Sequence, residues 1–93
     1  MPVDEGVRGT YLTKLRGLVA ARRDLLARAV EELRVARFEE AVRIRLSPAT
    51  LAVLVELGVF GRESAEEIQA RRDRLIAEVR AIEELLDAVG RAT

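Results

Sequence analysis

The sequence contains no cysteine and no histidine among its 93 residues. The first absence excludes disulfides and thiolate metal ligands, and the second excludes imidazole acid–base chemistry. Asparagine is also missing, and the aromatic residues are limited to Tyr11, Phe38 and Phe60. Aliphatic side chains must therefore supply the core. We expect no catalytic residue, no cofactor and no metal site.

Long apolar runs and an excess of one charge are missing as well. Sixteen basic residues balance sixteen acidic ones, which argues against general binding of polyanions. The longest apolar run, residues 51–55, is far shorter than the roughly 18 residues of a membrane span. The first residues are acidic rather than basic, unlike a signal peptide. These features predict a soluble cytoplasmic protein that does not enter a membrane.

What the sequence does contain is helical periodicity with start and stop signals. Thr10 can cap a first helix, Ser47-Pro48 can begin a second, and Ser64 with Glu67 can form a capping box. Glycines near residues 58 and 90 suit helix ends. We predict helices over about 11–45, 48–57 and 65–89 in one domain of residues 10–90, after a flexible tail of residues 1–9.

Apolar residues recur at spacings of three, four and seven along both long helices, as in a helix packed lengthwise against another. In the first helix only Arg22 interrupts this seam. Leu18, Leu25 and Val30 widen its apolar face, which indicates contact with more than one other helix. Gly17 is expected to relieve a close helix crossing.

The middle helix carries a single charge, Glu56, and is otherwise almost entirely apolar. A helix that is apolar nearly all round is expected to be buried on most sides. The predicted fold is therefore all-α: an antiparallel, coiled-coil-like helical hairpin with a short buried third helix between two long ones. Charges on the outer faces, such as the pair Glu67 and Arg71, are expected to be solvated.

A domain of this size buries only about 60–70% of its unfolded surface, so such broad stripes predict self-association. We expect a non-enzymatic helical interaction or assembly module. It would form a homodimer or higher oligomer, or dock onto another protein. The expected interface residues are Leu12, Leu15, Val19, Leu26, Leu33, Leu75, Ile82 and Leu86.

Residues 41–47 alternate apolar and polar side chains, as strands do, although they also continue the first helical face. If they form a strand before the Pro48 helix, the segment resembles the ribbon-helix-helix family of dimeric DNA-binding proteins. That resemblance implies an intermolecular strand over residues 42–47. It assigns base contacts to Arg43, Arg45 and Ser47, and it places amides near Ser64 on phosphate. The helical interpretation is preferred, because this chain offers such a strand no partner.

The abundant carboxylates occur mainly as adjacent pairs, which point about 100° apart on a helix and cannot form a local catalytic dyad. The long-short-long plan is also similar to the small helical chorismate mutases. That resemblance implies a dicarboxylate site with Arg22 as the cation and Gln69 as a neutral donor. More simply, the Arg22 stem packs in the seam while its head reaches water or an opposing glutamate.

Overall fold

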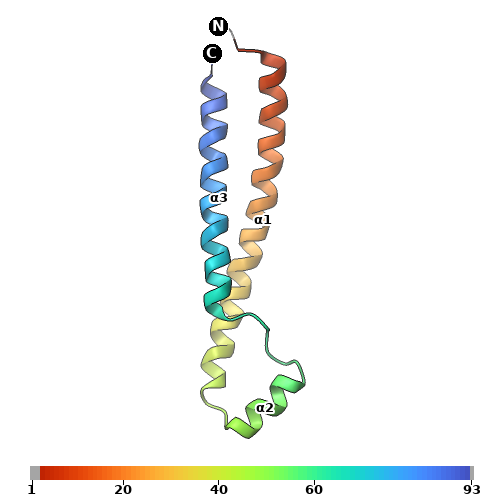
Figure 1. The fold of residues 1–93 in the computed structure, drawn as a ribbon, viewed down its shortest axis with the longest axis vertical. Coiled ribbons are helices and arrows are strands. Elements are labelled where there is room, and N and C mark those ends of the chain that lie inside the picture. The colour runs from red at the N-terminus through yellow and green to blue at the C-terminus, as the bar shows by residue number, and fades with distance from the viewer. Residues whose placement is uncertain (1–2, 93) are drawn as a thin grey trace. The chain divides into compact units, whose positions relative to one another are not determined.

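A computed structural model describes residues 3–92 of the chain (Figure 1). Its helices are α1 (Glu5–Arg43), α2 (Pro48–Glu56) and α3 (Ala65–Arg91), and residues 3–92 contain no strand. The two long helices pack against each other, and the short helix lies between them in the chain. The predicted all-α, long-short-long hairpin is confirmed. Within the ambiguous segment, α1 continues only to Arg43 and turns follow, so residues 41–47 form no strand and the first helix ends slightly before its predicted end at about residue 45.

α1 begins earlier than predicted, so the expected tail over residues 1–9 is wrong for residues 5–9. Asp4 caps the helix, because its Oδ1 accepts the Val7 amide at 3.0 Å. Thr10, the expected cap, lies inside the helix and donates its hydroxyl to the Gly6 carbonyl. An aspartate caps at least as well as a threonine, and Glu5 in the first turn favours the helix dipole. Residues 1–2 lie outside the described residues.

α2 starts and stops where its sequence signals predict. The Ser47 hydroxyl accepts the Thr50 amide at 3.3 Å, and Gly58 takes a left-handed φ of 71°. The Gly58 and Val59 amides then satisfy carbonyls of the last turn. However, no residue of α2 is buried, so the predicted burial of this helix is wrong for the single chain.

The chain divides into two compact units, which we call unit 1 (Met1–Ala27 with Asp73–Thr93) and unit 2 (Arg28–Arg72). Unit 2 has a small core of Leu33, Ala36, Ala65 and Ile68. Each of these side chains comes from α1 or α3. The core of unit 2 is therefore complete without α2.

Anchors from the end of α1 explain how α2 stays outside that core. The Glu39 and Glu40 carboxylates accept the amides of Gly61 and Ala65, at 3.0 Å and 3.1 Å. Arg43 lies over the Phe60 ring, 4.5 Å from its centroid, and donates to the Gly61 carbonyl. These contacts fix the loop that follows α2 independently of the side chains of the helix.

In unit 1 the start of α1 runs antiparallel to the end of α3. Arg8 donates to the Gly90 carbonyl, whereas Arg22 Nε lies 2.9 Å from Glu78 Oε2. Gly17 does not mark a close crossing, because a Cβ added there would meet no atom within 4 Å. That expectation is wrong because Gly17 lies on the side of α1 away from α3.

Candidate interaction surfaces

The eight predicted interface residues lie along the seam between α1 and α3. Leu15, Val19, Leu33 and Leu75 are buried within the chain. The other four are half-buried: Leu12, Leu26, Ile82 and Leu86. The single chain already covers much of this set, so the surface most available to a partner lies elsewhere.

A second apolar stripe runs along α1 beside the seam in unit 1. Its large side chains are Val7, Tyr11, Leu18 and Leu25, with exposed fractions of 57%, 46%, 39% and 40%. Their spacings of four, seven and seven residues place them on one side of the helix. The sequence indicated this second stripe only through Leu18 and Leu25, which widen the apolar face beyond the seam.

α3 contributes to the same side of unit 1. A shallow hollow of about 220 Å³ brings Val7 and Tyr11 of α1 together with Val89 and Ala92. Three exposed residues precede Ala92 at spacings of four, three and four residues. They are Ala88, Leu85 and Ala81. We call the combined surface the terminal face; it consists of Val7, Tyr11, Leu18, Leu25, Ala81, Leu85 and Ala88.

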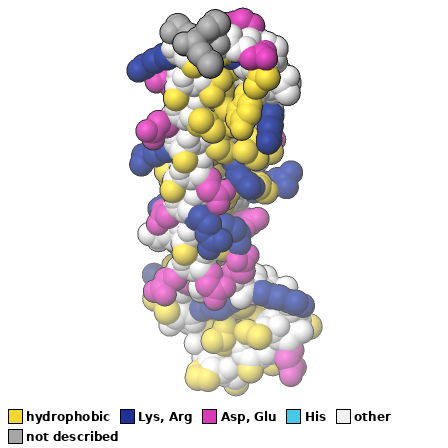
Figure 2. All heavy atoms as spheres, turned by 45° about the horizontal axis from the view of Figure 1, so that its top comes forward, with side chains coloured by type: hydrophobic (Ala, Val, Ile, Leu, Met, Phe, Trp, Pro, Cys, Tyr) yellow, Lys and Arg dark blue, Asp and Glu magenta, His cyan; other side chains and the backbone are white. Residues whose placement is uncertain are grey.

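The terminal face is almost free of charge, in contrast to the opposite flank of unit 1. Lys14 is the cation within its α1 stripe, with its Nζ 5.9 Å from the centroid of the Tyr11 ring. On the opposite flank, Arg23 pairs with Glu83 at 2.7 Å. Figure 2 shows hydrophobic side chains gathered at the end of unit 1 that carries the chain termini. One flank is thus hydrated and the other suits association.

Unit 2 carries a separate apolar surface on and beside α2. We call it the α2 surface and define it by Ile44, Val53, Val55, Leu57 and Val59, which are between 55% and 85% exposed. Leu51 and Leu54 are half-buried and face the rest of the unit. Exposed aliphatic groups this dense are typical of interaction sites.

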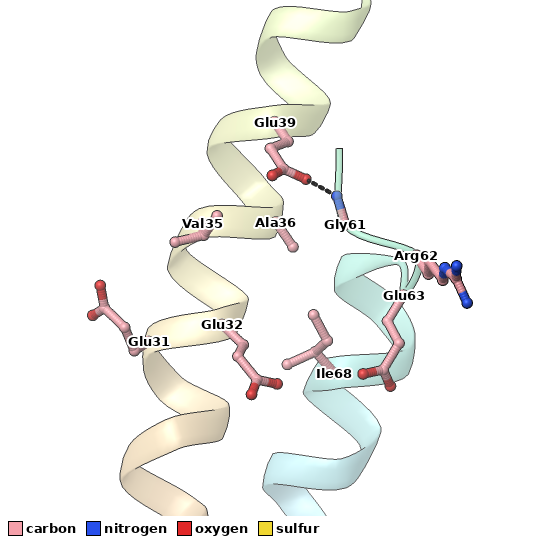
Figure 3. A pocket seen from close by; sticks show the side chains of 9 residues that line it. All are labelled: Glu31, Glu32, Val35, Ala36, Glu39, Gly61, Arg62, Glu63 and Ile68. Atoms are coloured by element: carbon pink, nitrogen blue, oxygen red, sulfur yellow. Dashed lines mark hydrogen bonds between the residues drawn. The ribbon is translucent and has the colours of Figure 1, made fainter. Parts of the chain in front are cut away.

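An acidic hollow of about 330 Å³ in unit 2 is less promising as a site (Figure 3). Four glutamates surround its apolar floor of Ala36 and Ile68, but each has a partner. Arg71 pairs with both Glu32 and Glu63, whereas Glu31 pairs with Arg34 and Glu39 with the Gly61 amide. These contacts hold the loop against α1.

Arg71 is the central charge beside that hollow. The hydrogen bond to Glu63 raises the pKa of the Arg71 guanidinium; desolvation opposes this effect, and the negative charges of Glu63 and Glu32 add to it. The sequence suggested instead that Arg71 pairs with Glu67 one turn away. Within residues 3–92, no group of three acidic side chains is arranged to hold a metal ion.

Most of the residues that the two family resemblances singled out have structural partners in this chain. Arg43 holds the loop after α2, and Ser47 caps α2, whereas Arg45 is exposed. Residues 42–47 are helix and turn rather than strand.

The two residues suggested by the chorismate mutase resemblance are also paired. Arg22 pairs with Glu78, as its simpler interpretation predicted. Gln69 accepts a hydrogen bond from Arg37 at 3.1 Å. Both polar groups therefore already have partners within the chain.

Comparison with protein-family models, curated proteins and solved structures finds no match to this chain. Among residues 3–92, no helix combines the length and the apolar character needed to span a bilayer. The chemistry of the two apolar surfaces therefore carries the functional conclusion.

Proposed function

We propose that this protein is a non-enzymatic helical interaction module, which assembles with itself or with another protein through aliphatic helix faces. The observation that carries the proposal is the exposure of the α2 surface. A nine-residue helix that is apolar on nearly every side contributes no buried residue to its own chain. Such a helix gains its main stabilisation only when another molecule covers it.

The terminal face supports the same function independently. Its large side chains are aliphatic or aromatic, and most of its remaining positions are alanine, which lets a second helix approach closely. Covering these groups gains about 25 cal/mol per Å² of apolar area. Binding here would depend on fit between helices rather than on hydrogen bonds.

Light scattering of the purified chain, over about a hundredfold range of concentration, tests the proposal together with affinity capture from source cells. We expect a mass above 10.3 kDa, or a defined partner whose capture is lost on Val53→Gln with Val55→Gln. Val30→Gln is the matched control, because Val30 is 51% exposed on α1 and belongs to neither surface. A chain of monomer mass that captures the same proteins with and without the α2 substitutions contradicts the proposal.

A further inference from the structure

The accessible area of the chain shows how much surface is available to a partner. The chain exposes 7135 Å², whereas a folded monomer of 10.3 kDa is expected to expose about 5,400 Å². The excess of roughly 1,700 Å² is larger than the approximately 800 Å² that each partner buries in an interface of standard size. A dimer interface is therefore well within the area available.

The order of residues along the terminal face of α1 is suited to pairing with a reversed copy of itself. At alternating spacings of four and three, the stripe reads Val7, Tyr11, Lys14, Leu18, Ala21 and Leu25. When two such stripes run antiparallel about their midpoint, Val7 faces Leu25 of the second copy, and Tyr11 faces Ala21. A large side chain thus meets a small one at the Tyr11 level. Lys14 faces Leu18, against which its aliphatic stem can pack.

Charges at the two ends of the stripe favour the same antiparallel pairing of two copies. The next position before Val7 is Asp4, and the next position after Leu25 is Arg28. In the antiparallel arrangement Asp4 of each copy faces Arg28 of the other, so opposite charges meet at both ends. Such pairing sets register and orientation more than it adds affinity.

α3 has its own midpoint, in the same part of unit 1. The midpoint of the α3 stripe lies between Leu85 and Ala88. When two copies of this stripe run antiparallel about that midpoint, Leu85 faces Ala88 of the second copy and Ala81 faces Ala92. The midpoints on α1 and α3 both lie between the contacts Arg8 to Gly90 and Arg22 to Glu78. A two-fold axis through the α1 midpoint therefore passes within about one helical turn of the α3 midpoint.

The hollow on the terminal face lies where this arrangement supplies a side chain. It is bounded by Val7 and Tyr11 on α1 and by Val89 and Ala92 near the end of α3. In the antiparallel register Leu25 of the second copy lies over Val7, beside this hollow. The hollow can thus receive a leucine from the second copy.

From these observations we infer that the partner at the terminal face is a second copy of this chain. The two copies pack face to face about a two-fold axis, with each helix antiparallel to its own counterpart, so that two unit 1 hairpins form a four-helix bundle. This inference rests on the proposed function and names its partner. It leaves the α2 surface of each copy open.

Disulfide formation between two single-cysteine variants tests the register, because the natural chain contains no competing thiol. Val7→Cys and Leu25→Cys are mixed in equal amounts, incubated in a glutathione redox buffer and analysed by intact-mass spectrometry. We expect the mixed disulfide to exceed either homodisulfide several-fold. Two copies of Val7 lie about 27 Å apart along the antiparallel helices, since a helix rises about 1.5 Å per residue.

A second measurement tests the dimer itself. Leu18→Lys is expected to reduce the mass in light scattering from twice 10.3 kDa to 10.3 kDa, because in this register each new lysine faces Lys14 of the second copy and like charges repel. Val30→Lys, on the other flank of α1, is the matched control and is expected to remain dimeric. Circular dichroism shows whether both variants keep their helix content.

The outcomes separate this inference from the proposed function. Predominant homodisulfides, or a dimer that Leu18→Lys leaves intact, overturn the arrangement while self-association stands. A monomer that still captures a defined partner through the α2 surface overturns the second copy as partner, but supports an interaction module. A monomer that captures nothing specific contradicts both.

Discussion

At the scale of single residues, position on the helix decides what an identical side chain does. Leu15 and Leu18 lie three residues apart on α1, yet Leu15 is 4% exposed and Leu18 is 39% exposed. The first belongs to the seam with α3 and the second to the terminal face. Both belong to the apolar face that the sequence displays, but only the structure decides which of them is covered within the chain.

Two exposed glycines illustrate the same point and yield a prediction. Gly17→Ala is expected to stabilise the fold by about 0.5–1 kcal/mol, because Gly17 is mid-helix and a Cβ there meets nothing within 4 Å. Gly58→Ala is expected to destabilise it by roughly 1 kcal/mol, since Gly58 has a φ of 71°. Urea denaturation of each variant at one fixed protein concentration measures the two changes.

Opposite signs are the essential result, because neither substitution removes a contact. If Gly17→Ala is destabilising, Gly17 must contact something that the isolated chain lacks. If Gly58→Ala is neutral, the end of α2 does not require the left-handed conformation.

At the scale of elements, α2 and α3 begin alike but are coupled differently to the rest of the chain. Each starts after a serine whose hydroxyl accepts an amide of the first turn, at 3.3 Å for Ser47 and 3.1 Å for Ser64. α3 buries Ala65 and Ile68 in its first turn, whereas α2 buries no residue. A cap therefore supports a core in one case and only its own helix in the other.

This difference predicts unequal effects of the same substitution. Ser64→Ala is expected to lower the global free energy of unfolding by about 1 kcal/mol, the usual cost of losing such a cap. Ser47→Ala is expected to increase amide exchange within α2 while the global value changes by less than about 0.5 kcal/mol. Denaturation combined with residue-resolved hydrogen exchange measures both effects. Equal global losses would show that α2 unfolds together with the hairpin.

At the scale of the whole molecule, ion pairs connect elements that are distant in sequence. They do not make the stability depend on pH near neutrality. Arg71 joins α3 to Glu32 of α1 and to Glu63 of the preceding loop. Its pKa is raised, chiefly by the hydrogen bond to Glu63. A raised pKa in the folded state stabilises the fold below the unfolded value, and this contribution is lost only as pH rises through the folded value.

This direction of the pKa shift predicts that the free energy of unfolding is nearly independent of pH near neutrality. For arginine the loss lies far on the alkaline side, and the chain has no histidine or cysteine to titrate at intermediate pH. The free energy of unfolding should therefore change by less than about 0.5 kcal/mol between about pH 6 and about pH 9. Thermal denaturation across this range measures it, with Arg71→Gln as the comparison. A clear transition near pH 7 would contradict the prediction.

Much of the local structure follows from the sequence alone. The three helices, the Ser47 and Ser64 caps and the end of α2 at Gly58 depend on interactions between residues a few positions apart, which a sequence displays directly. The predicted start of α1 at Thr10 is too late because Asp4, which caps at least as well, lies six residues earlier and accepts the Val7 amide.

Only the tertiary structure decided which apolar residues remain uncovered. The wide stripe on α1 predicted more than one neighbouring helix, but it did not decide which of its residues are covered within the chain. Likewise, the composition of α2 predicted burial, whereas contacts from Glu39, Glu40 and Arg43 hold its following loop and leave the helix exposed. Periodicity determines which side of a helix avoids water, but the number of elements available to cover that side is a property of the assembled chain.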